Sequence, residues 1–223
     1  QLAQPEGRVA EQDQRHRCGC GCACPQDAGD LAEGEFGFEE DVIEALLGLS
    51  RISTAELAIR PVNLTQVCMD AAAALREKHP SHNVQLDIAP NMHVEGDARL
   101  LRIAMDCLLA NAWKFTIKAE HPTVSVGVQT GVTGGHIYFV RDNGIGFDMA
   151  YANKLFVPFQ RLHPDAEFQG SGIGLVTAQR VIARHGGRIW AEAQVNEGAT
   201  FYFTINAPLG PPATPWRCCE SRR

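Results

Sequence analysis

The chain has 223 residues, 45% of them apolar and 21% charged, a globular composition with room for one domain of about 150 residues plus appendages. Its 20 basic and 26 acidic residues give a net charge of −6, which argues against nucleic acid binding through bulk charge. No stretch approaches the ~18 apolar residues of a membrane span, and the first residues lack the apolar core of a signal peptide. We therefore expect a cytoplasmic protein.

The eight cysteines are distributed unevenly. Four alternate with other residues over 18–24, Cys218 and Cys219 are adjacent, and only Cys68 and Cys107 lie within the patterned part of the chain. The first run could bind a soft metal, but structural zinc sites usually combine two cysteine pairs that are far apart in sequence. We favour an unstructured segment over a metal site and expect no disulfide framework.

Regular structure is expected only from residue 39 onward, because residues 1–38 show neither helical nor strand periodicity. Apolar residues then recur at helical spacing over 39–60, and Pro61 is expected to end this helix. A second helix is expected from Leu64 to about Lys78.

Strands and helices alternate in the rest of the chain. The pattern predicts a strand over 84–88, a helix from the N-cap Asp97 to about Lys118, and two strands over 123–128 and 136–140. After an irregular segment at 144–170, it predicts a helix over 171–185 and a hairpin of 188–193 with 199–205. The tail from Pro208 is expected to be disordered. This order predicts an α+β fold, a two-layer sandwich with helices on one face of a mixed, mostly antiparallel sheet.

Two polar segments of this pattern could bind a ligand. Asn111 and Lys114 lie one turn apart on the 97–118 helix, where an amide oxygen suits Mg²⁺ and an ammonium suits phosphate, although a solvated helix face fits as well. Asp142 ends a strand and is followed by Gly144 and Gly146. Its carboxylate could accept a hydrogen bond from an exocyclic amine, although the same residues are also common in a turn.

Glycines also precede the helix predicted at 171–185. Gly170-Ser-Gly172-Ile-Gly174 would expose backbone N–H groups at a helix N-terminus, an arrangement that attracts phosphate. The irregular segment before them contains Phe156, Phe159 and Arg161, which suits either a mobile lid or a packed surface loop.

In this order, the segments resemble the conserved boxes of sensor histidine kinases of two-component systems. The residues within the boxes are most similar to those of phytochrome-like and PAS-linked kinases. Residues 107–116 resemble the N box, 142–148 the first glycine box, 156–163 the F box, 170–175 the second glycine box and 187–201 the closing hairpin. The resemblance covers roughly residues 39–207.

The resemblance implies that residues 61–207 form the catalytic ATP-binding domain shared with DNA gyrase, heat-shock chaperones and mismatch-repair ATPases. By this resemblance Asn111 would hold Mg²⁺, Lys114 would contact the ATP phosphates, Phe115 would lie near the adenine, and Asp142 would take its amino group. The residues expected to complete the site are Gly144 and Gly146 at the adenine, Gly170, Gly172, Gly174 and Leu175 over the phosphates, Arg161 at the γ-phosphoryl group, and Thr200 beneath the adenine.

Two departures from the family stand out. No phosphoacceptor histidine motif is present, and residues 39–60 resemble only the second helix of the dimerisation hairpin, which could still mediate a homodimer. Cys107 stands where the family more often has Asn, and a thiol is a poor hydrogen-bond partner, so phosphoryl transfer could be slower. Residues 1–38 remain unassigned, and residues 208–223 are expected to be a disordered tail.

Three functions stay open. The leading hypothesis is the ATP-binding core of a sensor histidine kinase, which acts on a histidine phosphoacceptor domain and, through it, a response regulator. The alternatives are a related serine kinase that acts on a partner protein, and a nucleotide-binding or docking module without kinase activity.

Overall fold

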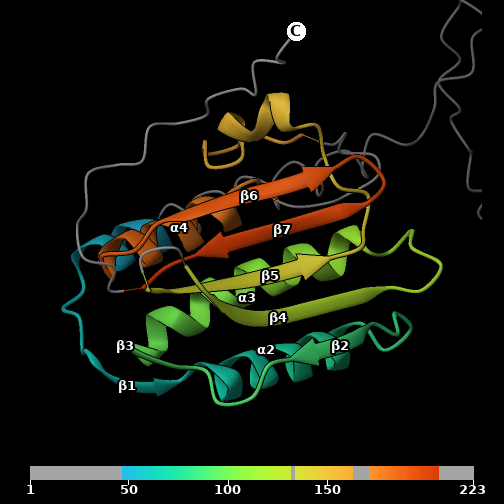
Figure 1. Ribbon diagram of the computed structural model, residues 1–223. Coiled ribbons are helices and arrows are strands. Elements are labelled where there is room, and N and C mark those ends of the chain that lie inside the picture. The colour runs from blue at the N-terminus through green and yellow to red at the C-terminus, as the bar shows by residue number, and fades with distance from the viewer. Residues whose placement is uncertain (1–46, 132–133, 163–170, 206–223) are drawn as a thin grey trace, which may run out of the picture. The chain divides into compact units, whose positions relative to one another are not determined.

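Five strands form one mixed sheet with helices behind it, as Figure 1 shows for residues 47–131, 134–162 and 171–205, which the computed structural model describes. The strand order is β2 (Gln85–Ile88), β4 (Thr123–Thr130), β5 (His136–Asp142), β7 (Gly198–Phe203) and β6 (Ile189–Gln194). β2 and β4 are parallel, and the other neighbours are antiparallel. The predicted two-layer α+β sandwich is therefore confirmed.

The helical layer consists of α2 (Leu64–Lys78), α3 (Ala98–Phe115) and α4 (Gly174–Arg184). Side chains cap the first two helices: Asn63 accepts a hydrogen bond from the Gln66 N–H, and Asp97 accepts from the N–H groups of the first turn of α3. The starts of both helices are as the sequence predicted, because each combines a capping residue with a clear apolar period.

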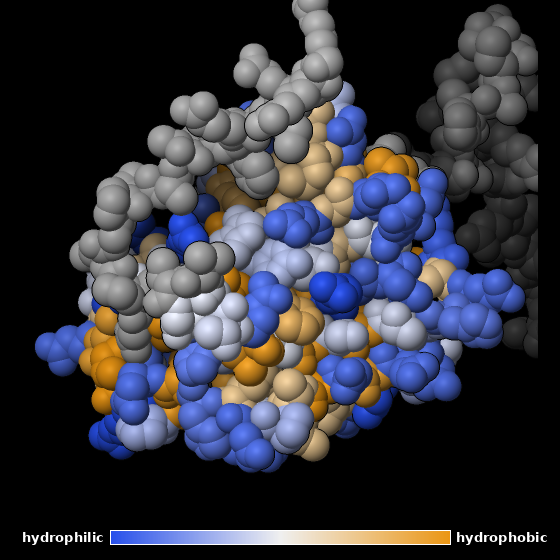
Figure 2. Space-filling view, in the orientation of Figure 1, coloured by the Kyte–Doolittle hydropathy of each residue, from blue (hydrophilic) through white to orange (hydrophobic). Residues whose placement is uncertain are grey.

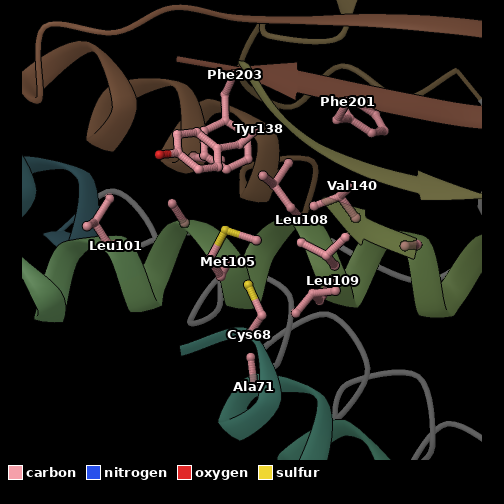
Figure 3. Packing of buried hydrophobic residues seen from close by; sticks show 14 of the residues in the cluster. Cys68, Ala71, Leu101, Met105, Leu108, Leu109, Tyr138, Val140, Phe201 and Phe203 are labelled. Carbon is pink, nitrogen blue, oxygen red and sulfur yellow. The ribbon is translucent and has the colours of Figure 1, made fainter. Parts of the chain in front are cut away.

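The hydrophobic core is built around α3. Figure 3 shows Leu101, Met105 and Leu108 of this helix between α2, which contributes Cys68, and the sheet, which contributes Phe203. Each of these large side chains is almost completely buried, and such burial stabilises a fold by roughly 1.5–3 kcal/mol per side chain. Because α3 is packed on two sides, its remaining polar face has a fixed position.

Two short strands were missed by the sequence analysis. β1 (Arg60–Asn63) pairs antiparallel with β3 (His93–Gly96). The helix expected to continue towards Arg60 ends at Thr54, and Pro61 lies inside β1 instead of ending a helix. Proline is compatible with this strand because β1 pairs along one edge only, so its missing N–H can face outwards.

The helix that contains residues 47–54, here called the linker helix, is attached to α4. Arg180 Nε donates to Ser53 Oγ at 3.0 Å, and Arg184 donates to the carbonyl oxygens of Ile52 and Ala55. The last carbonyls of a helix have no partner within the helix, so Arg184 caps this end. The linker helix is thereby held against the outer side of α4.

Several expectations concern residues outside the described ranges: the segment 1–38 with its cysteine run, and the tail from Pro208. Among the described helices, none combines the length and apolar character needed to cross a bilayer.

Candidate functional site

A pocket of about 490 Å³ opens beside the polar face of α3. Cys107, Asn111 and Lys114 line it from this helix, at the spacing of four and three residues that places side chains on one face. The end of β5, the start of α4 and the segment before it form the other walls. The structure thus collects around one cavity the motifs that the sequence separates by dozens of residues.

Asp142, at the end of β5, lines the pocket and is 4% exposed. Its Oδ1 accepts hydrogen bonds from the N–H of Gly144 at 2.9 Å and of Ala199 at 3.4 Å. Burial raises the pKa of this carboxyl to about 6, because these two bonds offset only part of the loss of solvation. The group is therefore held in place while its charge is incompletely compensated.

The two glycines after Asp142 allow the chain to turn close to this carboxyl. A Cβ at Gly144 would lie 2.3 Å from the carbonyl oxygen of Phe115, and one at Gly146, where φ is +57°, would lie 2.0 Å from the carbonyl oxygen of Gln194. No side chain fits at either position without moving backbone. Both glycines thereby allow the loop to lie directly against the end of α3 and against β6.

Two cations face the pocket. Lys114 and Arg161 both line it, and the Lys114 ammonium lies 4.5 Å from the centre of the Phe115 ring. The pKa of Lys114 is lowered, mainly by burial and further by the charge of Arg161. Like charges in one partly buried cavity repel each other, so an anion between them would be stabilised.

Backbone groups extend this positive character. α4 begins at Gly174, three residues later than predicted, because Gly172 has φ +71° and cannot continue a helix. The N-cap residue Ile173 makes no side-chain capping bond, and Ser171, Gly172, Gly174 and Leu175 line the pocket. The helix dipole and the backbone N–H groups of the first turn favour a bound anion at this end.

The segment between β5 and α4 covers part of the pocket. It contains the short 3-10 helix η1 (Met149–Lys154) and contributes Leu155, Arg161 and Leu162 to the lining. Phe159 adopts φ +63°, which is uncommon for a non-glycine residue, and its N–H donates to the Gly172 carbonyl at 3.3 Å. This bond ties the cover to the glycine segment that begins α4.

A sequence model described as "Histidine kinase-, DNA gyrase B-, and HSP90-like ATPase" matches residues 96–209, just over half of the 223 residues. The chain belongs to this ATPase family. Cyanobacterial phytochrome A of a Nostoc species is 35% identical over 173 residues, 77% of this chain and 22% of the relative. Methanogenesis regulatory histidine kinase FilI of Methanothrix harundinacea is 30% identical over 170 residues, 76% of this chain and 19% of the relative. The chain thus spans about a fifth of the length of these curated relatives.

Solved structures of histidine kinases share the ATPase-family fold. Full-length ShkA in complex with AMPPNP has a TM-score of 0.63 at 24% identity, over 79% of this chain and 37% of that chain. Histidine kinase ThkA in complex with response regulator protein TrrA has a TM-score of 0.59 at 20% identity, over 82% of this chain and 52% of that chain. At these identities the similarity establishes the fold.

Most of the predicted site residues line the family pocket: Asn111, Lys114, Phe115, Asp142, Gly146, Arg161, Gly172, Gly174 and Leu175. Gly144 is not among the lining residues, but its N–H donates to Oδ1 of Asp142 at 2.9 Å. Gly170 falls outside the described residues.

The expected position of Thr200 beneath the adenine needs correction. Ala199 and Phe201 line the pocket, and successive side chains of a strand point to opposite faces, so Thr200 points to the other face of the sheet. There its Oγ1 accepts a hydrogen bond from Arg141 Nε at 3.2 Å. The resemblance had given Thr200 a role at the adenine, but the structure turns its side chain away from the pocket.

Four further apolar lining residues were not predicted by the sequence analysis. The apolar part of the pocket lining includes Phe147, Leu155, Leu162 and Phe201. Phe147 lies within the first glycine box, and Phe201 is adjacent to Thr200 in a predicted strand, so both signals were present in the sequence. Asp106, whose carboxylate pairs with Arg102 at 2.8 Å, also reaches the pocket and was missed.

Cys107 lies among the polar lining residues. Burial raises the pKa of its thiol to about 11, and the charge of Asp106 adds to this effect. The thiol is therefore protonated at neutral pH and cannot act as a base. Its Sγ lies 3.9 Å from the position that a Cβ on Gly174 would take, so Cys107 faces the start of α4.

Proposed function

We propose that this pocket binds Mg-ATP and that the chain is the catalytic core of a two-component sensor histidine kinase, which transfers the γ-phosphoryl group to a histidine of an acceptor domain. One observation carries the proposal: a single cavity is lined by a buried carboxylate, two cations and a helix N-terminus that lacks a side-chain cap. This combination of groups suits an adenine ring and a triphosphate.

Asp142 would accept a hydrogen bond from the adenine amino group. Its Oδ1 is already fixed by two backbone N–H groups, so the carboxylate is oriented before the ligand arrives. The apolar side chains of Phe147 and Phe201, which line the pocket, would contact the faces of the base. Such a site recognises adenine through one directed polar bond within an apolar cavity.

Lys114 and Arg161 would neutralise the phosphates, with Arg161 at the γ-phosphoryl group, and the glycines at the start of α4 would donate backbone N–H groups. Asn111 is the residue that would hold Mg²⁺ through its side-chain oxygen. One protein ligand fits Mg²⁺, which retains several waters and binds phosphate oxygens directly. No group of three or more His, Cys, Asp or Glu residues among the described residues forms a separate metal site. Bound Mg²⁺ would supply charge neutralisation of the phosphates.

The domain assignment follows from the same proposal. Residues 61–207 would be the catalytic domain, and residues 39–60 would be the second helix of a dimerisation hairpin, through which two chains could pair. A separate domain would supply the phosphoacceptor histidine and pass the group to a response regulator, the kind of partner bound to the related kinase ThkA. The attachment of the linker helix to α4 supports a fixed junction between the two parts.

Calorimetry of Mg-ATP binding to the full chain tests the pocket. We expect saturable binding that Asp142→Ala abolishes and that Asn111→Ala makes independent of Mg²⁺. Matched controls are Asp87→Ala, an exposed strand carboxylate on β2, and Gln66→Ala, an exposed amide on α2, neither of which lines the pocket. Binding that survives Asp142→Ala would refute the adenine assignment.

Transfer is tested separately by adding a histidine acceptor domain in trans with radiolabelled ATP. Label that becomes acid-labile on the acceptor, and depends on Lys114 and Arg161, supports the kinase. Tight ATP binding without transfer to any of several acceptor domains would favour a nucleotide-binding module.

A further inference from the structure

A row of aromatic side chains crosses the face of the sheet opposite the helices. Phe139 of β5 is the cross-strand partner of Tyr202 of β7, and Tyr202 is the partner of Trp190 of β6. Their ring centroids are 6.3 Å and 5.5 Å apart, and the rings of Tyr202 and Trp190 are stacked at 16°. All three side chains are only partly buried. We refer to Phe139, Tyr202 and Trp190 as the aromatic row.

Neighbouring residues shape this surface. A Cβ at Gly127, the partner of Phe139 on β4, would lie 2.5 Å from the ring, so the ring of Phe139 leans over this glycine. With Gly127 the row crosses four strands, about 14 Å at ~4.8 Å per strand. The guanidinium of Arg141 lies 5.5 Å from the centre of the Phe139 ring, and that of Arg188 lies 5.0 Å from the Trp190 ring.

The aromatic row is distinct from the ATP pocket. Tyr202 alternates with Phe201, which lines the pocket, so the two residues point to opposite faces of β7. Figure 2, in the orientation of Figure 1, shows apolar and intermediate residues interspersed with hydrophilic ones on the visible face of the molecule. Cross-strand aromatic pairs stabilise a sheet. A row whose rings keep some exposure between arginines is also the kind of surface that binds proline-rich segments in the polyproline II conformation.

The sequence contains such a segment immediately after β7. The described residues end at Ile205, and four prolines and a tryptophan follow: Pro208, Pro211, Pro212, Pro215 and Trp216. We propose that residues 208–216, here called the proline segment, bind the aromatic row of the same chain.

Reach and proximity support this occupant. At about 3.1 Å per residue, nine residues in the polyproline II conformation extend about 28 Å, twice the length of the row. Only Asn206 and Ala207 separate Ile205 from the proline segment, and β7 itself carries Tyr202. A ligand tethered this closely reaches an effective concentration of about 1 mM, enough to occupy a weak site. A net charge of −6 makes a nucleic acid a poorer occupant.

Indole N–H signals in ¹H–¹⁵N NMR spectra of the full chain test the proposal. The sequence has three tryptophans: Trp190 in the row, Trp216 in the proline segment, and Trp113, which is 2% exposed in the helical layer. Replacing Pro211 and Pro212 together by glycine should shift the Trp190 and Trp216 signals by more than a linewidth. The Trp113 signal should stay in place, which also shows that the variant is folded. Ser221→Gly, which lies beyond the proline segment, is the matched control and should shift none of the three signals.

A peptide of residues 206–217, added at up to about 1 mM, should return the Trp190 signal of the double-glycine variant towards its wild-type position. It should fail to do so when Tyr202→Ala is also present. An identical Trp190 signal in wild type and the double variant would overturn the proposal. A Trp190 shift that depends on protein concentration would also overturn it, because the occupant would then be a second copy of the chain.

Discussion

Two buried aspartates in this molecule have opposite electrostatic environments. Asp97, before α3, is 1% exposed, and Asp142, at the end of β5, is 4% exposed. Asp97 accepts hydrogen bonds from the backbone N–H groups of Ala58, Arg99 and Leu100 and pairs with the Arg99 guanidinium at 3.0 Å. Its pKa is held well below the usual range, chiefly by Arg99. The pKa of Asp142 is instead raised to about 6 by burial.

The difference separates a structural carboxylate from the one that we propose binds the nucleotide. The charge of Asp97 is compensated within the fold. Its carboxylate accepts hydrogen bonds from Ala58, after the linker helix, and from the first turn of α3. Its backbone N–H donates to Nε2 of His185 at 2.9 Å. The charge of Asp142 is left partly unsatisfied beside a cavity. Groups with poorly compensated charge in a pocket are typical of functional sites because a ligand completes their interactions.

Replacement of Asp97 should have the largest effect on stability. Asp97→Ala removes the N-cap of α3 and leaves the Ala58 and Leu100 N–H groups without their acceptor, so we expect a loss of about 2–4 kcal/mol in the free energy of unfolding. Denaturant unfolding measures it, with Asp70→Ala on the exposed side of α2 as the control. The ATP affinity of the folded variant should be unchanged, and a large loss of affinity would contradict the separation of roles.

Asp142→Asn should show the reverse pattern. Exchanging a charged hydrogen-bond acceptor for an amide removes about 1.5–3 kcal/mol of binding, roughly a 10- to 100-fold loss of ATP affinity. The free energy of unfolding should not fall at pH 7, because the amide oxygen can keep the two backbone bonds while the buried charge is lost. Calorimetry and denaturant unfolding of the same sample measure both, and a less stable variant would show that Asp142 is also structural.

The two aspartates should also give opposite pH dependences. The pKa of Asp142 is higher in the folded state, so its ionisation destabilises the fold. We therefore expect its contribution to the free energy of unfolding to decline as the pH rises from about 4 to 6, by at most about 3 kcal/mol. Asp97, with a lowered pKa, contributes stability above pH 4 that is lost at lower pH. In unfolding curves between pH 3 and 7, Asp142→Asn should remove the decline in stability between about pH 4 and 6. Asp97→Asn should remove the loss of stability below pH 4. If neither variant changed the profile, the assigned pKa directions would be wrong.

Thr200→Val should have the smallest effect. It removes the partly buried bond from Arg141, worth about 0.5–1.5 kcal/mol, on the face away from the pocket. We expect unchanged ATP affinity, measured by calorimetry beside Ala199→Val, which adds volume inside the pocket and should weaken binding. Equal losses in both variants would place Thr200 at the nucleotide after all.

Long elements and glycine motifs could be predicted from the sequence because their local signals agree. The capping residues Asn63 and Asp97 fix where α2 and α3 begin, and the stripe of Asn111 and Lys114 follows once α3 is placed. β1 and β3 could not be predicted, because four residues show too little alternation and Pro61 argued for a helix end.

The face of the sheet on which Thr200 lies could be predicted only with the register of β7. A shift of one residue exchanges the two faces of a strand, and here Gly198 sets the register. Gly198 has φ +99°, and a Cβ at this position would lie 2.0 Å from the carbonyl oxygen of Asp142. That contact joins segments distant in the sequence, so no local pattern reports it.

The parallel pairing of β2 with β4 has a consequence for the order of folding. The connection between these strands includes β3 and all of α3, and such a long crossover closes slowly compared with a hairpin. The antiparallel β4, β5, β7 and β6 can assemble with α3 first, leaving the edge strand β2 to join late. Every strand that lines the proposed ATP pocket belongs to the earlier group, so local opening of the β2 edge would leave the walls of this pocket intact.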